Sequence, residues 1–176
     1  MARQSANLKR RGFLAAVAAS SLGCSRTKAT WWFFTAGEAR LVDALTERII
    51  PADQDPGASQ AGVVEFIDRQ LVRHYRKYQT TYRGGLAAVE ASARARFGKA
   101  FADLPPDAQS QLLAAVEEDP ATKDFFAMLV AHTMQGYYGD PRHGGNRDQV
   151  AWRMLGLPYP PVRGRDQYDF TAPKRG

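Results

Sequence analysis

Apolar side chains recur every three or four residues through much of this chain, which is the period of helices that bury one face. Thr35 and Glu38 have the spacing of a capping box, in which each side chain accepts a hydrogen bond from the other residue's backbone. The apolar period that follows them stops at Pro51. The pattern predicts a first helix that begins after Thr35 and ends before Pro51.

The middle of the chain predicts two more helices. Apolar residues return at the same period from Val63 to Tyr78, which is typical of one long amphipathic helix. Gly84 and Gly85 then interrupt the period, because glycine is a poor helix former. A third helix is expected after this glycine pair, and it ends near Gly98.

Two further helices follow. Pro105 and Pro106 open the fourth, since proline is tolerated in the first turn, and Asp107 suits the positive end of the helix dipole. A fifth helix is predicted to start at Asp119 and Pro120. Five of its apolar side chains are expected to be strongly buried, namely Phe125, Phe126, Leu129, Val130 and Met134.

The segment from Gly136 to Asn146 differs from the rest, because it contains four glycines and one proline. Residues of these types predict a loop built from turns. Asn146 is expected to cap a short helix that contains Trp152 and ends at Gly156. From Tyr159 onward, several prolines predict an extended tail.

No stretch shows sustained alternation of apolar and polar residues, so no strand is predicted. The expected fold class is all-α, a single compact helical domain with a glycine-rich loop, a short last helix and an extended C-terminal tail. The length of 176 residues and the hydrophobic fraction of 44% suit one folded domain.

The net charge of +6 is concentrated at the N-terminus. Four of the 24 Lys and Arg residues lie before position 24, where the chain has no Asp or Glu, and the remaining 20 face 18 acidic residues. A body with a charge of about +2 is too weakly basic for nucleic-acid binding driven by counterion release. The N-terminal charges instead point to targeting.

Residues 1–24 have the three-part layout of an export signal: a basic start, a short apolar run and small residues after it. Arg10 and Arg11, followed by Phe13 and Leu14, resemble the twin-arginine signal of proteins that are exported already folded. The alternative is a Sec signal that contains two arginines, but the weakly hydrophobic, Ala- and Ser-rich run favours the twin-arginine type. The run is shorter than the roughly 18 to 20 residues that span a bilayer.

Cys24 is the only cysteine, so the chain forms no internal disulfide. Its place directly after the apolar run makes it a candidate lipidation site, and the alternative is an ordinary thiol in a spare segment. A diacylated cysteine has the two buried chains that stable membrane anchoring requires. Residues 25–34 are expected to form a tether, and residues 35–176 the helical domain. Aromatic residues 31–34 either join the core or cover a partner or membrane surface.

The sequence contains few of the motifs that are typical of catalytic subunits. It contains no glycine-rich dinucleotide fingerprint for FAD or NAD, no Cys-x-x-Cys-His motif for haem attachment and no P-loop. His74, His132 and His143 are too scattered to suggest a zinc site. We therefore expect no catalytic, cofactor-binding or metal-ligating residue, with His74 and His132 as ordinary core or surface residues.

The polar side chains of the glycine-rich loop allow three interpretations. Asp140, Arg142 and Asn146 can hold the loop together through turns and ion pairs, present a docking surface to a partner, or form an active site. The first two are favoured, since no nucleophile or carboxylate set is recognisable beside His143. The candidate structural or partner-binding residues are Gly139, Asp140, Pro141, Arg142, Gly144, Gly145, Asn146 and Trp152.

The run from Gly136 to Asp148, together with Trp152 and the Gly-Leu-Pro sequence that starts at Gly156, resembles the signature of the gluconate 2-dehydrogenase subunit 3 family. The upstream pattern is similar as well: a twin-arginine signal, a helix followed by Pro-Ala-Asp, and a Leu-Pro-Pro helix start. The resemblance covers nearly all of the chain after the signal.

This resemblance implies a partnership rather than a reaction. Members are small, non-catalytic subunits of membrane-associated periplasmic dehydrogenases, in which a large flavoprotein with bound FAD oxidises a sugar, a sugar acid or a polyol. In many members, a multihaem cytochrome c is a third subunit that takes the electrons, and the resemblance leaves open whether this complex has one. The small subunit is implied to act like a chaperone that lends its export signal to the folded flavoprotein and stabilises it. The alternative is a stand-alone periplasmic enzyme or lipoprotein with a site in residues 136–148.

Overall fold

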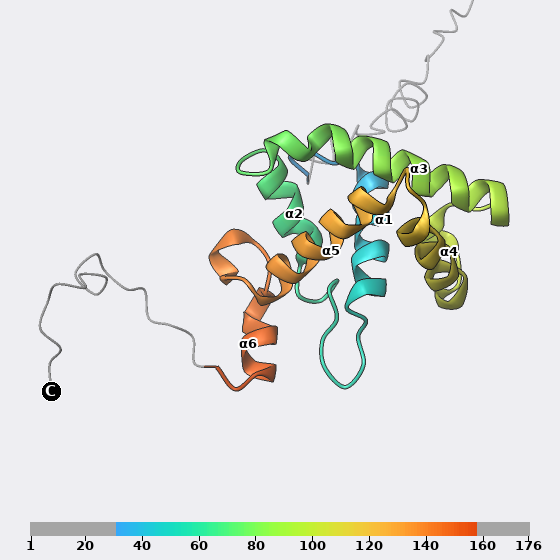
Figure 1. Cartoon of the computed structure of the whole chain (residues 1–176). Coiled ribbons are helices and arrows are strands. Elements are labelled where there is room, and N and C mark those ends of the chain that lie inside the picture. The colour runs from blue at the N-terminus through green and yellow to red at the C-terminus, as the bar shows by residue number, and fades with distance from the viewer. Residues whose placement is uncertain (1–30, 158–176) are drawn as a thin grey trace, which may run out of the picture. The chain divides into compact units, whose positions relative to one another are not determined.

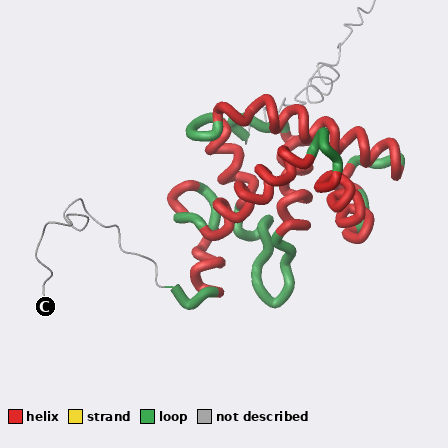
Figure 2. The backbone as a smooth tube through the Cα atoms, in the orientation of Figure 1, coloured by secondary structure: helices red, strands yellow, loops and turns green. Residues whose placement is uncertain are grey.

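The computed structural model describes residues 31–157, which form six α-helices joined by turns and no strand (Figure 1 and Figure 2). The prediction of an all-α fold is confirmed for this part of the chain. The predicted export signal, Cys24 and the first part of the predicted tether lie outside the described residues. The predicted C-terminal tail lies outside them as well.

The helices are α1 (Ala36–Ile49), α2 (Val63–Leu71), α3 (Gln79–Phe97), α4 (Pro106–Glu118), α5 (Lys123–Tyr138) and α6 (Val150–Met154). α5 packs against the other five helices and is therefore the centre of the domain. Figure 1 shows α5 crossing α1, with α3 along one side of the domain and α4 beside the far end of α3.

α1 begins with the predicted capping box. The Glu38 N–H donates to the Thr35 hydroxyl at 3.2 Å, and the Thr35 N–H donates to the Glu38 carboxylate at 2.9 Å. These bonds satisfy backbone groups that have no partner within the helix. The helix ends at Ile49, two residues before Pro51, as the apolar period predicts.

The prediction of a single helix from Val63 to Tyr78 is wrong, because α2 ends at Leu71. The Tyr75 N–H donates to the Gln70 carbonyl at 2.8 Å, which closes a turn in place of a continued helix. A short 3-10 turn then leads into α3. The apolar period persists through this turn because its aromatic side chains still pack against the core.

α3 runs without a break through Gly84 and Gly85, so the prediction of a helix that starts after this pair is also wrong. The reason is tertiary packing. A Cβ atom on Gly85 would lie only 2.1 Å from the Phe125 ring of α5, so glycine lets the two helices approach. The predicted end of this helix is confirmed, since Gly98 has a φ of +68° in the left-handed region.

α4 begins at Pro106 with Asp107 in its first turn, as predicted. α5 begins at Lys123, which is later than the sequence predicts. The Asp119 carboxylate accepts the Ala121 N–H at 2.9 Å and holds these residues in a turn before the helix.

The expected burial of α5 is only partly correct. Phe125 and Leu129 are buried and two of the other apolar residues are half-buried, but Met134 is 43% exposed. Met134 is two residues from the buried His132, which is about 200° around a helix. It therefore lies on the side of α5 opposite His132, where solvent reaches its side chain.

The core extends to the residues just before α1. Val42, Ile67 and Leu129 are completely buried at its centre. Phe34 is 5% exposed, and its ring centroid lies 5.9 Å from that of Tyr82 on α3. The end of the predicted tether is thus part of the folded domain.

Candidate functional site

The glycine-rich loop starts where α5 ends and is held first by an ion pair. The Asp140 carboxylate accepts the Arg142 N–H at 2.9 Å and the Arg142 guanidinium at 2.6 and 2.9 Å. These hydrogen bonds from the Arg142 side chain hold the pKa of Asp140 below its ordinary value. Asp140 is therefore ionised at neutral pH and lacks the proton that a general acid must donate.

The glycines of the loop let it fold back against two helices. A Cβ atom on Gly145 would lie 2.0 Å from the Gly136 carbonyl oxygen of α5. One on Gly144 would lie 3.0 Å from the Arg69 side chain of α2, and Gly144 also has a φ of +109°. Glycine is the residue that permits such close approach and this backbone conformation.

Asn146 is the buried centre of the loop, with an exposed fraction of 0%. Its side-chain amide donates to the Gly139 carbonyl at 2.9 Å, and its side-chain oxygen accepts the Ala151 N–H at 3.0 Å. Asn146 therefore joins the start of the loop to the first turn of α6. The residue directly before that helix is Gln149, so Asn146 caps it from further away than predicted.

The far side of the loop is attached to α2 and α5. The Arg147 N–H donates to the Ala61 carbonyl at 2.9 Å, and its guanidinium pairs with Glu65 at 2.7 Å. The Trp152 indole N–H donates to the Tyr138 carbonyl at 2.8 Å. These contacts support the interpretation of a self-structured loop, and they give it the rigidity that a docking surface needs.

A shallow groove lies beside this loop, across α5 and α2. Its lining residues are Phe66, Met134, Gln135, Tyr138, Gly139 and His143. Met134 is 43% exposed and Tyr138 is 38% exposed, although both side chains are large and largely apolar. Exposed apolar and aromatic side chains gathered on a rigid surface are typical of protein interfaces. We call these six residues the α5 groove. The groove was not predicted from the sequence, because Met134 was expected to be buried.

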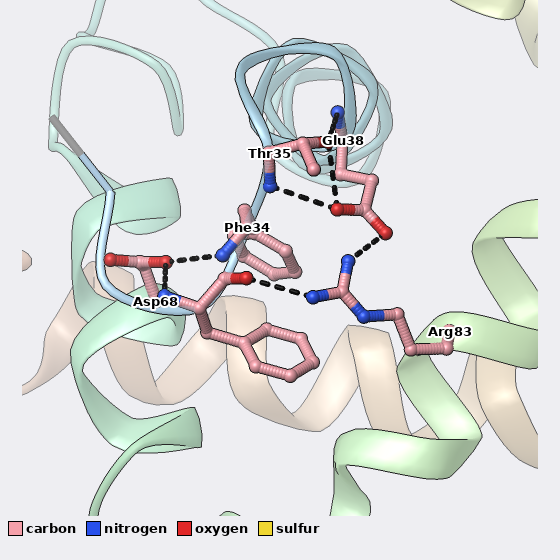
Figure 3. A network of polar contacts seen from close by, with 6 residues as sticks. Phe34, Thr35, Glu38, Asp68 and Arg83 are labelled. Atoms are coloured by element: carbon pink, nitrogen blue, oxygen red, sulfur yellow. Dashed lines mark hydrogen bonds and ion pairs between the residues drawn. The ribbon is translucent and has the colours of Figure 1, made fainter. Parts of the chain in front are cut away.

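Residues just before α1 are held against α2 by Asp68 (Figure 3). Its carboxylate accepts the backbone N–H groups of Trp32 at 2.7 Å, Phe33 at 2.9 Å and Phe34 at 2.9 Å. Asp68 is only 3% exposed. Asp68 is not among the residues predicted from the sequence, although a carboxylate in register with the buried apolar side chains of α2 is a signal that could have identified it.

Arg83 of α3 holds the same segment from another side (Figure 3). Its guanidinium donates to the Phe33 carbonyl at 2.9 Å, lies 4.2 Å from the centroid of the Phe33 ring and pairs with Glu38. Burial raises the pKa of Glu38, but hydrogen bonds from Arg83 and Thr35 outweigh it, and the net pKa is lowered. We call Asp68 and Arg83 the N-terminal latch.

The comparisons with known proteins identify the family. The family model for gluconate 2-dehydrogenase subunit 3 matches residues 36–158, which is more than two thirds of the chain. This chain belongs to the gluconate 2-dehydrogenase subunit 3 family. No curated protein and no solved structure matches it. The resemblance found in the sequence is confirmed.

A member of the gluconate 2-dehydrogenase subunit 3 family is an accessory subunit of a dehydrogenase that has several subunits. The matched residues 36–158 include the whole glycine-rich loop, the α5 groove and the two residues of the latch. The features described above are thus parts of the domain that defines the family.

The three histidines of this family member lie in three separate places. His74 and His143 are exposed, whereas His132 is 4% exposed and stacks on Tyr75 with ring centroids 4.0 Å apart. Burial lowers the pKa of His132 to about 4, so its ring is neutral at pH 7 and hydrogen-bonds the Tyr82 hydroxyl at 3.0 Å. His132 is a core residue.

Among residues 31–157, no three His, Cys, Asp or Glu side chains gather closely enough to hold a metal ion. None of the helices in the same range is long and apolar enough to cross a membrane.

Proposed function

We propose that this chain is the non-catalytic small subunit of a periplasmic, FAD-dependent dehydrogenase that oxidises a sugar, a sugar acid or a polyol. In this proposal, it escorts the folded flavoprotein through twin-arginine export and stabilises it afterwards. FAD is held by the large subunit, and where the complex has a third subunit, it is a multihaem cytochrome c that accepts the electrons. The family match over residues 36–158 is the observation that carries this proposal.

The α5 groove supports a role in binding a protein. It presents Met134 and Tyr138 on a scaffold whose neighbouring loop is fixed by buried Asn146. A surface that is rigid before binding loses little conformational entropy when the partner docks. We assign the flavoprotein contact to this groove.

The N-terminal latch supports the escort role. An export signal can bring along a folded cargo only if it is firmly connected to the domain that holds the cargo. Three hydrogen bonds to Asp68 and one from Arg83 fix residues 32–34, so tension on residues 1–30 is carried by α2 and α3. The buried Phe34 strengthens this connection.

The export half of the proposal is tested by substituting the paired arginines. In Arg10→Lys/Arg11→Lys, the charge is kept but the receptor-read pair is lost, so this chain and the flavoprotein should both stay in the cytoplasm. The measurement is dye-linked sugar oxidation and flavin absorbance in the periplasmic fraction. Arg3→Lys, which changes an arginine outside the pair, is the control and should export normally. Export of an active flavoprotein without the paired arginines would contradict the escort role.

The docking half is tested by co-purification with the flavoprotein. Met134→Ser/Tyr138→Ser should weaken the complex about tenfold for each side chain that the partner buries, since well-packed interface residues contribute over 1 kcal/mol each. Leu155→Ser is a matched control, because Leu155 is 52% exposed, directly after α6 and outside the groove. If both variants retain the flavoprotein equally, the α5 groove is excluded as the docking surface. Substrate turnover by the purified chain alone would favour the alternative, a stand-alone enzyme.

A further inference from the structure

A basic surface lies at the end of α2 and in the turn that leads to α3. Arg69, Arg73, Arg76 and Lys77 are all exposed, and the sequence has no acidic residue from position 69 to position 89. None of these four side chains forms an ion pair with another residue in the range 31–157. Their charges are available to an external anion.

Trp32 belongs to the same surface. Its side chain is 56% exposed, and its ring centroid lies 5.9 Å from the Arg69 guanidinium and 5.4 Å from that of Arg73. The backbone of Trp32 is fixed by its hydrogen bond to the buried Asp68 at 2.7 Å. The latch therefore holds a large indole ring at the surface, beside two guanidinium groups.

This combination matches the chemistry of a bilayer surface. Tryptophan concentrates at the headgroup level of membranes, where its ring meets the apolar chains and its N–H meets water. Unpaired Arg and Lys side chains add attraction to anionic lipids. An acidic protein surface would also pair with these charges, and interfaces between proteins use tryptophan as well. The place of this surface beside the N-terminal segment is what favours the lipid headgroups.

The position of the surface along the chain favours the same partner. Residues 1–30, which carry the predicted export signal, join the described domain at Trp31, next to this surface. Cys24 is seven residues before Trp31, and an extended chain of that length reaches at most about 25 Å. An N-terminal segment held at a membrane would keep the basic surface within reach of the lipid headgroups.

We propose that Trp32, Arg69, Arg73, Arg76 and Lys77 form a peripheral membrane-binding surface that takes the headgroups of anionic phospholipids. It shares no residue with the α5 groove and goes beyond the escort function, because it orients the complex on a membrane. Each cation near an anionic bilayer strengthens binding by about fivefold. This contribution falls as salt screens the charges.

The test is sedimentation of the full chain with phosphatidylcholine vesicles that contain or lack phosphatidylglycerol. The paired substitution Arg73→Gln/Lys77→Gln should weaken binding to the anionic vesicles about 25-fold, from two cations. Arg96→Gln/Lys99→Gln removes one Arg and one Lys that are also exposed, at the other end of α3, and should bind as the unchanged chain does. The second pair matches the first in net charge and in residue types.

A second measurement tests whether Trp32 enters the bilayer. Lipids brominated on their acyl chains should quench the fluorescence of the full chain in anionic vesicles, and Trp32→Phe should remove most of this quenching while the helical circular dichroism is kept. Equal weakening by both charge pairs would show a general effect of net charge and overturn the proposal. Unchanged vesicle binding of Arg73→Gln/Lys77→Gln would do the same. A third result would also overturn it: if Arg73→Gln/Lys77→Gln no longer co-purifies with the flavoprotein but still binds vesicles, this surface is a protein interface.

Discussion

Replacing Asp68 with alanine tests how the segment before α1 is held. The carboxylate is 3% exposed and accepts three backbone N–H groups, so alanine leaves all three donors without this partner. Hydrogen bonds to a charged acceptor contribute about 1.5 to 3 kcal/mol each, so their complete loss inside a closed structure would cost 4.5 kcal/mol or more. At that cost, it is more favourable for the segment to detach from α2 than to stay in place without these hydrogen bonds.

The segment can instead detach and let water bond its N–H groups. Detachment exposes Phe34, which is otherwise 5% exposed, at a cost of about 1.5 to 3 kcal/mol. It also breaks the hydrogen bond from Arg83 to the Phe33 carbonyl, at about 1 kcal/mol. The three hydrogen bonds to Asp68 are lost in this outcome as well, but the freed backbone regains conformational entropy of about 1 to 2 kcal/mol per residue, which offsets much of their loss. We therefore expect Asp68→Ala to lower the free energy of unfolding by about 3 kcal/mol and to free residues 31–34.

Urea unfolding followed by circular dichroism measures this loss, and tryptophan fluorescence should shift to longer wavelength before unfolding begins. Asp68→Asn should lose about 1 to 2 kcal/mol, because its oxygen can keep two acceptor bonds while its amide faces the remaining N–H. Asp148→Asn is the control at an exposed position and should change stability by less than about 0.5 kcal/mol. If Asp68→Ala behaves like this control, the latch does not hold the segment.

Three other predictions concern the packing of the helices and the loop. Gly84→Ala should stabilise the protein by about 0.5 to 1 kcal/mol, because alanine is the better helix former and the added methyl group meets nothing. Gly85→Ala should destabilise it by about 1 to 3 kcal/mol, because this methyl group would meet the buried Phe125 ring. Thermal melts in which both variants shift in the same direction would contradict this reasoning. The pKa of His132 is lowered from 6.5 to about 4, so the unfolded chain takes up a proton at higher pH than the folded one. The free energy of unfolding should thus fall as the pH drops from 6.5 toward 4, and His132→Gln should flatten this profile in urea titrations at several pH values. Asn146→Ala should lower the free energy of unfolding by about 2 to 4 kcal/mol, against about 1 kcal/mol for Asp148→Ala. Both residues have positive φ, but only Asn146 has a buried side chain with two hydrogen bonds, so equal losses would assign the effect to the backbone.

The helix ends that the sequence predicts correctly depend on interactions between near neighbours. Thr35 and Glu38 cap each other across three residues, Pro106 suits a first turn, and Gly98 adopts the left-handed conformation that ends a helix. Each of these signals acts within one helical turn, so it can be read without knowledge of the fold. The family signature is likewise a local run, which the match over residues 36–158 confirms.

The sequence by itself thus determined the all-α class, most of the helices and the family of this chain. Tertiary structure alone decided that Gly85 is a helix contact, that Met134 faces outward in a groove, and that Asp68 and Arg83 hold the start of the domain. These properties depend on residues far apart in the chain, such as Asp68 and the N–H groups of residues 32–34. Periodicity reports which side chains are apolar, but it does not report which surface of a helix another helix will cover.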